Sequence, residues 1–282
     1  MNLKLFPDAD KIRTDLEEGS GLFRWEMTTT EILADTPSEW FLSLGERIGT
    51  PVSQSATGDK ILSIRNESFG KDDNRTRGPN TNRKLGFHTD RCDVIGFLCL
   101  QPARSGGENQ VVNSTRISEI IHKERPDLHE ILCQAFPYKR HVVDKGNTLP
   151  YCMQPVFSWK DKHFACSYLR VLINRADQDA QCPDLSNVQR EALDFLDSVC
   201  ERDTLQIRFT LKRGELLFLN NWTTLHRRTA FEDFEEPEKR RHLLRVWLSV
   251  PNSRPLDESF RANFGAVEAG AIRGGMQPCG RA

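Results

Sequence analysis

The feature that most constrains the fold is a succession of short apolar or alternating runs with few helical segments between them. Runs of this kind, bounded by Gly, Pro and Asn, are typical of β-strands. Because so few helices separate them, the pattern disfavours a parallel βαβ sheet and predicts an antiparallel sandwich or jelly roll with helices packed outside. The predicted strands are Lys60–Arg65, Leu85–Leu100, Thr204–Leu211, Glu215–Leu219 and Leu243–Val250.

Three segments carry helical patterns. Ser38–Ile48 is one, and Ile117–Phe136 reads as two short helices separated at Pro126. Asn187–Cys200 is the clearest amphipathic helix, because its apolar residues recur at helical spacing. The chain contains no internal repeat and no low-complexity tract, so a single domain over residues 1–282 is predicted.

The segment Asn66–Lys84 is long and polar, with Gly, Pro, Asn and alternating charges. This composition predicts a loop. Long loops inside compact domains are uncommon and often act as lids or binding loops, so we expect a lid that carries substrate contacts. Simple disorder is the alternative interpretation.

Charge and composition exclude several classes of protein. The 282 residues include 39 basic and 40 acidic side chains, so no basic footprint for nucleic acid is present. No stretch approaches the roughly 18 apolar residues that span a bilayer, and the amino terminus lacks a secretory pattern. We expect a cytoplasmic protein whose partner is a small molecule, and a homo-oligomer is left open. The eight cysteines form no C-x-x-C pair, so free thiols are expected.

His88 and Asp90 stand one residue apart within an apolar stretch, GFHTDRCDVIGF. On a strand, residues two apart project to the same face, roughly 6.5–7 Å apart at Cα. The two side chains are therefore expected to converge while Thr89 points away. They fit two ligands of one metal ion, and a buried hydrogen-bonded pair is the alternative.

His226, in the run NNWTTLHRRTAF, is the candidate for a third ligand. Two histidines and one carboxylate on a β scaffold form the facial triad of non-haem iron(II) oxygenases, which leaves coordination positions open. Zinc is the alternative metal, although catalytic zinc sites usually keep a single open position.

Two arginines follow in KRRHLLRVWLSVP. If this segment is a strand, Arg241 and Arg245 share a face with Leu243 and Trp247. An inward-pointing guanidinium is costly unless it meets an anion, and it binds a carboxylate in a bidentate fork. The alternative is that Arg241 is solvated at the start of the strand.

The order HTD, SGGEN (Ser105–Asn109), NNWTTLHRRTAF and RRHLLR resembles the taurine dioxygenase / clavaminate synthase-like family of iron(II)- and 2-oxoglutarate-dependent oxygenases. The matching motifs run from Leu85 to Val250. The resemblance implies a double-stranded β-helix, that is, a jelly roll of the cupin-like kind, with iron at the mouth of the barrel. It also implies 2-oxoglutarate and dioxygen as co-substrates.

The resemblance assigns residues to roles. It implies that His88, Asp90 and His226 bind the metal and that Arg241 holds the distal carboxylate of 2-oxoglutarate. Arg245 is then expected nearer the metal, beside the other carboxylate or the substrate. Asn109 stands where many members have a threonine that bonds to the co-substrate. Arg228 is expected to support the site from behind rather than to act in it.

The implied reaction is hydroxylation or desaturation of an unactivated C–H bond, with release of succinate and carbon dioxide. Halogenating relatives lack the metal-binding carboxylate, so Asp90 disfavours halogenation. The substrate is expected to be a small polar molecule such as an amino acid, a sulfonate or a biosynthetic intermediate, with Arg65, Arg170 and Arg245 as candidate contacts. A metal-dependent hydrolase or isomerase and a non-catalytic ligand-binding barrel remain the alternatives.

Overall fold

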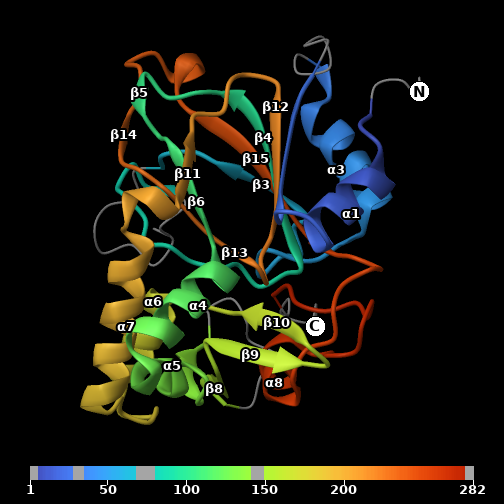
Figure 1. Ribbon diagram of the computed structural model, residues 1–282. Helices are drawn as coiled ribbons and strands as arrows, with labels where there is room; N and C mark the ends of the chain where they lie inside the picture. The colour runs from blue at the N-terminus through green and yellow to red at the C-terminus, as the bar shows by residue number, and fades with distance from the viewer. Residues whose placement is uncertain (1–5, 28–34, 68–79, 141–148, 277–282) are drawn as a thin grey trace.

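The computed structural model describes residues 6–27, 35–67, 80–140 and 149–276, in which antiparallel sheets are flanked by helices (Figure 1). The largest sheet has six strands, and every pairing in it is antiparallel. Its order is β1 (Leu22–Glu26), β12 (Glu215–Asn220), β4 (Val94–Gln101), β15 (His242–Ser249) and β2 (Thr50–Pro51), with β3 (Ile61–Ile64) also paired to β15.

A second sheet of three strands faces the larger one across a shared apolar core. Its order is β11 (Gln206–Phe209), β6 (Asn109–Asn113) and β13 (Thr224–Arg228). Three two-stranded pairs complete the strands: β5 (Ser105–Gly106) with β14 (Phe231–Glu232), β7 (Phe136–Lys139) with β8 (Tyr151–Gln154), and β9 (Phe157–Lys160) with β10 (His163–Cys166). The two main sheets form the predicted jelly-roll core.

Side chains of the larger sheet alternate between two cores. In β4, Val94 and Leu98 pack on the outer face, whereas Ile95 and Cys99 point between the two sheets. The central strands β12 and β15 follow the same alternation. Because both faces of the sheet are covered, these strands are apolar almost without interruption, as buried strands are.

Helices α1 (Ala9–Glu17) and α3 (Pro37–Ile48) cover the outer face of the larger sheet (Figure 1). The amphipathic stripe of α3 buries Trp40, Phe41 and Leu44 completely against that face. These helices therefore stiffen the sheet on the side away from the smaller sheet.

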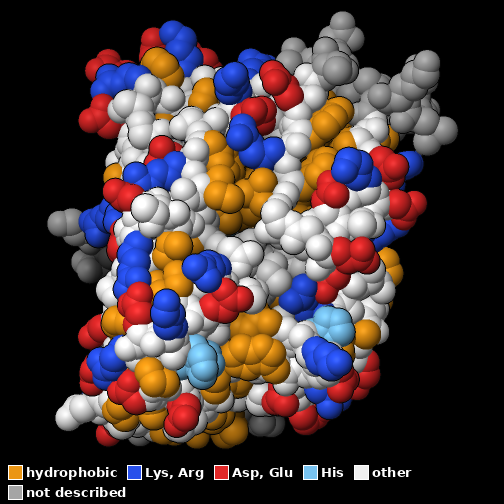
Figure 2. Space-filling view, in the orientation of Figure 1, with side chains coloured by type: hydrophobic (Ala, Val, Ile, Leu, Met, Phe, Trp, Pro, Cys, Tyr) orange, Lys and Arg blue, Asp and Glu red, His pale blue; other side chains and the backbone are white. Residues whose placement is uncertain are grey.

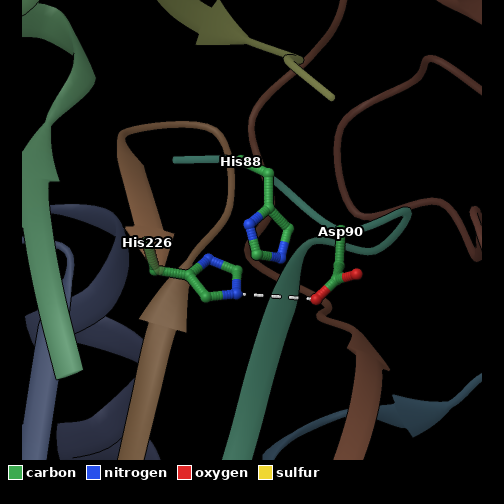
Figure 3. A group of neighbouring side chains, drawn as sticks. All are labelled: His88, Asp90 and His226. Carbon is green, nitrogen blue, oxygen red and sulfur yellow. Dashed lines mark ion pairs between the residues drawn. The ribbon is translucent and has the colours of Figure 1, made fainter. Parts of the chain in front are cut away.

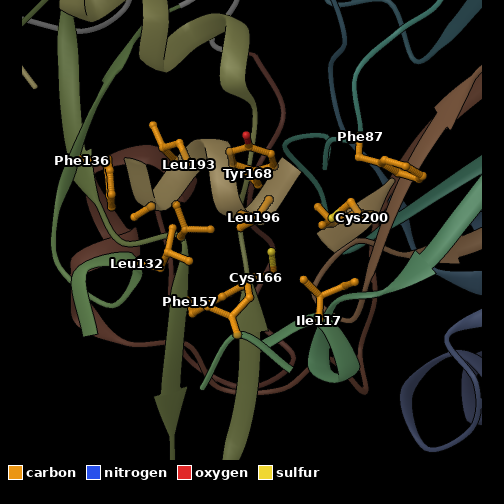
Figure 4. Packing of buried hydrophobic residues seen from close by; sticks show 14 of the residues in the cluster. Phe87, Ile117, Leu132, Phe136, Phe157, Cys166, Tyr168, Leu193, Leu196 and Cys200 are labelled. Carbon is orange, nitrogen blue, oxygen red and sulfur yellow. The ribbon is translucent and has the colours of Figure 1, made fainter. Parts of the chain in front are cut away.

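A second helical layer lies beside the smaller sheet and the hairpins. It contains α4 (Ser114–Glu124), α5 (Pro126–Leu132), α6 (Arg170–Asp177) and α7 (Asn187–Cys200), and α8 (Arg261–Phe264) follows near the carboxyl end. Leu193 and Leu196 of α7 pack among apolar side chains of this layer, including Phe157 (Figure 4). A capping box between Ser186 and Gln189 fixes where α7 begins.

The mainly β fold with flanking helices is confirmed, and the predicted helices match α3, α7 and the pair α4–α5, which meet at Pro126. The predicted strand Leu85–Leu100 was wrong in extent, because the regular strand begins only at Val94. Thr204–Leu211 was also too long, since β11 is preceded by a 3-10 turn at Asp203–Leu205. Strand β13, which carries His226, had no prediction of its own.

Acidic and basic side chains are interspersed on the face shown in Figure 2, with hydrophobic side chains gathered in smaller areas among them. None of the helices in the described ranges is long and apolar enough to cross a membrane. The seven cysteines in those ranges are free thiols.

A buried ion pair ties the carboxyl-terminal segment to the loop that follows Asp90. Arg273 Nε donates to Asp93 Oδ1 at 2.6 Å, and both side chains are fully buried, with 0% and 1% exposure. The same carboxylate accepts bonds from the Trp222 indole and the Ser249 hydroxyl. Residues 250–276 are therefore anchored behind the segment that carries Asp90.

We expect Arg273→Ala to lower the free energy of unfolding by about 3–5 kcal/mol, because removal of one partner leaves Asp93 as an uncompensated buried charge. Thermal unfolding would measure the loss. Arg261→Ala is the matched control, since its ion pairs with Glu258 and Glu268 are exposed and worth about 0–1 kcal/mol. Equal melting temperatures for the two variants would contradict the anchoring role.

Candidate active site

Three side chains that the sequence assigned to a metal site converge in the structure. His88, Asp90 and His226 each offer one ligand atom, and these atoms lie within 4.8 Å of one another (Figure 3). His226 Nε2 is 3.6 Å from Asp90 Oδ2. Asp90 Oδ2 is buried and has no hydrogen-bond partner within the described residues. A buried carboxylate oxygen without a donor is costly unless it meets a cation, so this donor set fits a metal ion.

The backbone brings these ligands together through a single bridge rather than a regular strand. His88 and His226 each donate a backbone N–H to the other's carbonyl at 3.0 Å. Thr89 instead bonds to Tyr168, through its own N–H at 2.7 Å and through its hydroxyl, which accepts from the Tyr168 N–H at 3.0 Å. Thr89 is thereby turned away, and Asp90 faces the same side as His88.

The protonation states of the ligands suit a cation. His88 Nδ1 donates to the Gly86 carbonyl at 2.9 Å, which leaves Nε2 of the neutral ring with a free lone pair. Burial, assisted by the neighbouring His226, lowers the pKa of His88 to about 4. Burial alone would raise the pKa of Asp90, but the charge of Arg245 and the two imidazoles outweigh it and hold this pKa below its usual range.

The triad opens into a pocket between the two sheets. Its walls are mainly apolar, and four arginines and one asparagine supply most of the remaining polar groups. The lining residues are Ile64, Leu85, His88, Asp90, Phe97, Asn109, Val111, Leu217, Leu219, His226, Arg227, Arg228, Arg241, Leu243 and Arg245. A cavity with a few convergent polar groups in apolar walls is typical of a small-molecule site.

Arg241 and Asn109 lie in this pocket, as the resemblance implied. Arg241 is 4% exposed, and its Nη1 has no hydrogen-bond partner in the part of the chain that the structure describes. Burial lowers its pKa to about 10, and the nearby Cys99 and Asp233 oppose this shift. A buried guanidinium with a free donor is a site for an anion.

Arg245 lies deeper, next to the metal ligands, with Nη1 at 3.8 Å from Asp90 Oδ2. Gln54 holds it from behind. The Gln54 carbonyl oxygen accepts from Arg245 Nε at 2.7 Å, while its amide donates to the Arg245 backbone carbonyl at 2.9 Å. Gln54 is fully buried and was missed by sequence reasoning, because its 191-residue separation from Arg245 gives no local signal.

We expect Gln54→Leu to lower the rate of substrate oxidation about 10-fold, because Arg245 loses the acceptor that fixes its guanidinium. It should also reduce stability by about 1–3 kcal/mol, since buried carbonyls lose their donor. Gln54→Glu keeps an acceptor but adds a charge that competes with Asp90 for Arg245. Succinate assays and thermal unfolding of both variants test this role. A wild-type rate in Gln54→Leu would show that Arg245 needs no such support.

The other two candidate substrate arginines lie outside the pocket lining. Arg170 binds Asp194 and Asp197 on α7 at 2.7 and 3.1 Å, so its charge is already paired. Arg65 is exposed, and its Nη2 bonds to His242 Nδ1 at 2.6 Å. The structure therefore does not bring Arg65 or Arg170 together with the metal ligands.

The predicted lid, Asn66–Lys84, falls mostly outside the described residues, which resume at Asn80. Its described end contacts the pocket through Arg228, whose Nη2 donates to the carbonyls of Thr81 and Arg83 at 2.8 and 3.1 Å. Arg228 itself is among the residues that line the pocket.

The fold and the site define a non-haem iron oxygenase. The family described as "Taurine catabolism dioxygenase TauD, TfdA family" matches residues 33–247 of the chain. The chain belongs to this family, and it is a 2-oxoglutarate-dependent dioxygenase, as the sequence motifs implied. Neither the family match nor the named relatives support the alternatives, which were a metal-dependent hydrolase or isomerase and a non-catalytic ligand-binding barrel.

Curated relatives agree with this assignment. The FR-33289 synthase of Streptomyces rubellomurinus is 29% identical over 91% of this chain and 77% of its own length. The taurine hydroxylase-like protein SAT17 of Stachybotrys chartarum is 30% identical, over 63% of this chain and 48% of its own length. The mitochondrial trimethyllysine dioxygenase of Gallus gallus is 25% identical over 63% of this chain and 46% of its own length.

Solved structures share the fold at low sequence identity. An asparagine oxygenase in complex with Fe(II), hydroxyasparagine and succinate superposes with a TM-score of 0.67 at 15% identity, over 85% of this chain and 79% of its own. The non-heme iron oxygenase OrfP, in complex with Fe, succinate and a hydroxyarginine, gives a TM-score of 0.63 at 14% identity, over 85% and 80% of the two chains. The likeness confirms the jelly-roll fold.

Proposed function

We propose that this dioxygenase hydroxylates a small polar molecule that carries an anionic group, with His88, Asp90 and His226 holding Fe(II). Arg241 and Asn109 hold the distal carboxylate of 2-oxoglutarate, and Arg245 meets an anionic oxygen of the substrate or of the co-substrate beside the metal. The observation that carries this proposal is one pocket that holds buried groups of both signs. Asp90 Oδ2 and Arg241 Nη1 are both buried, and neither has a hydrogen-bond partner within the described ranges.

When bound, Fe(II) and 2-oxoglutarate would activate dioxygen, which is the oxidant: one oxygen atom would go into succinate as 2-oxoglutarate loses carbon dioxide, and the other would oxidise an unactivated C–H bond of the substrate. The protein contributes binding, orientation and exclusion of water. The neutral ring of His88 and the ionised Asp90 are ready to bind a cation without losing protons. The apolar walls, among them Phe97, Leu217 and Leu243, keep bulk water from the bond that reacts.

The charge of the pocket supports an anionic substrate. The relatives include proteins named for trimethyllysine and for uridine-5'-phosphate, and a taurine hydroxylase-like protein, and the solved neighbours hold hydroxylated asparagine and arginine. Arg245 is the pocket arginine that lies beside the metal ligands. Gln54 binds Arg245 as a neutral amide, and Asp90 Oδ2 lies 3.8 Å from its guanidinium. Once a metal ion takes up the charge of Asp90, the guanidinium can meet a carboxylate, sulfonate or phosphate group.

The test is anaerobic addition of Fe(II) and 2-oxoglutarate, followed by oxygen. We expect a weak visible charge-transfer band in the wild type and none in His88→Ala, and admission of oxygen should release succinate. A panel of amino acids, sulfonates and phosphate esters should then show which class accelerates succinate release. Mass spectrometry distinguishes hydroxylation, which adds one oxygen atom, from desaturation, which removes two hydrogens. Acceleration by uncharged compounds alone would contradict an anionic substrate.

A further inference from the structure

Arg228 presents an unused donor to the same pocket as Arg241. It lies two residues after the metal ligand His226 on β13, so both side chains project to one face of that strand. It is 5% exposed and lines the pocket. One half of its guanidinium is fixed, because Nη2 donates to two backbone carbonyls of residues 81 and 83. Nη1 is buried and has no hydrogen-bond partner in the described chain.

The two guanidiniums form one site. Arg228 comes from the smaller sheet and Arg241 from the residue that precedes β15 in the larger sheet. Both pack on the ring of Phe231, with Cζ to centroid distances of 4.5 Å for Arg228 and 5.1 Å for Arg241. Both guanidiniums also line the same pocket.

The balance of charge at this site calls for one anion. Asp233 lies beside this pair of arginines, because its Oδ1 accepts the backbone N–H of Arg241 at 2.8 Å. Two positive charges and one negative charge leave a net charge of +1. A single carboxylate would neutralise it and would also accept bonds from both Nη1 atoms, each of which is otherwise a buried donor without a partner among residues 6–27, 35–67, 80–140 and 149–276.

The neighbouring strand supports this assignment. Asn109 at the start of β6 is paired directly with Arg228 across the smaller sheet, so it lies beside the same guanidinium. Among the described residues, the Asn109 amide donates one long bond of 3.4 Å, to the Phe209 carbonyl. Gly107 has φ near 70°, and a Cβ there would lie 3.5 Å from Arg241 Nε. The SGGEN turn is therefore packed directly against the proposed anion site.

We propose that Arg228 is a second binding residue for the distal carboxylate of 2-oxoglutarate, so that this carboxylate lies between Arg228 Nη1 and Arg241 Nη1. The proposal rests on the proposed function, because it assumes that 2-oxoglutarate occupies this pocket. Each guanidinium gives one charge-assisted bond, and the paired carbonyls of residues 81 and 83 keep Arg228 from turning away.

The test compares two 2-oxoacids that differ only at the distal end. 2-Oxopentanoate has a methyl group where 2-oxoglutarate has its distal carboxylate, and both chelate Fe(II) through the 1-carboxylate and the keto oxygen. The dissociation constant of each acid is measured anaerobically from the charge-transfer band, without turnover. We expect Arg228→Gln to weaken 2-oxoglutarate about 10-fold or more and to leave 2-oxopentanoate unchanged. Arg228→Lys keeps the charge, so its dissociation constant for 2-oxoglutarate should lie between those of the wild type and Arg228→Gln.

Controls separate the possible failures. Arg202→Gln removes an arginine that pairs with Glu124 outside the pocket lining and should change neither constant. Equal weakening of both acids in Arg228→Gln, or no change in either, would overturn the role of Arg228. If Arg228→Gln does not fold, Arg228→Lys is measured in its place. Weaker binding of 2-oxoglutarate with unchanged binding of 2-oxopentanoate would then support the role of Arg228, and an unchanged ratio of the two dissociation constants would overturn it. Absence of any band in the wild type would instead overturn the proposed function.

Discussion

Asp90→Ala is expected to abolish both metal binding and succinate formation. Asp90 is the sole carboxylate in the group of metal-binding residues found in the described chain, and its Oδ2 faces His226 at 3.6 Å. Loss of activity should exceed about 100-fold, since even residues that only orient metal ligands are worth about 10- to 100-fold. Equilibrium dialysis with Fe(II) and the succinate assay measure the two effects.

Two comparisons make the Asp90 result interpretable. Asp90→Glu keeps the charge but moves the oxygens by one methylene, so weak metal binding with little turnover is expected. Removal of Asp90 also leaves Arg245 without its nearest carboxylate, at 3.8 Å, so the stability of Asp90→Ala must be measured as well. Wild-type Fe(II) affinity in folded Asp90→Ala would contradict the proposed metal site.

Arg241→Met is expected to weaken the binding of 2-oxoglutarate and to raise the free energy of unfolding of the protein without ligand. Methionine fills a similar volume without a charge, so it removes a buried guanidinium whose Nη1 has no partner in the part of the chain that the structure describes. We expect the free energy of unfolding without 2-oxoglutarate to rise by on the order of 1 kcal/mol. Hydrogen bonds to charged groups contribute about 1.5–3 kcal/mol each, so 2-oxoglutarate should bind at least about 10- to 100-fold more weakly.

Thermal unfolding with and without co-substrate tests both effects of Arg241→Met. In the wild type, 2-oxoglutarate with a divalent metal should raise the melting temperature, because it binds only the folded state. In Arg241→Met the baseline should be higher and this increase should shrink. A variant that keeps wild-type affinity for 2-oxoglutarate would contradict the role assigned to Arg241. A variant with a lower baseline would show that Arg241 also supports the fold.

The sequence predicted the parts of the site that rest on local spacing. The alternation of β15 placed Arg241 and Arg245 on one face, and both lie in the pocket. His88 and Asp90 converge as expected, although their segment is held by a bridge to His226 and by Tyr168 rather than by a regular ladder. The prediction from strand periodicity was correct for these two side chains, because Thr89 between them still points away from His88 and Asp90.

The errors arose where partners distant in the sequence decide the outcome. Arg170 was a candidate substrate contact, and Arg228 was expected from the family resemblance to support the site; the neighbours that each meets in the structure differ. Arg170 faces two carboxylates of α7, which pair its charge. Arg228 donates through Nη2 to two backbone carbonyls, and its Nη1 has no hydrogen-bond partner within the described residues. Gln54 gave no signal, because a lone glutamine becomes meaningful only once Arg245 lies beside it.

The sequence by itself determined the class of fold and the candidate metal ligands, because strand periodicity and motif order are local properties of the chain. Only the tertiary structure decided which buried charges are paired and which are left for a ligand. Pairing depends on how the two sheets face each other, and β13 and β15 belong to different sheets (Figure 1). That arrangement places Arg228 and Arg241 around one site, a juxtaposition that no spacing along the chain expresses.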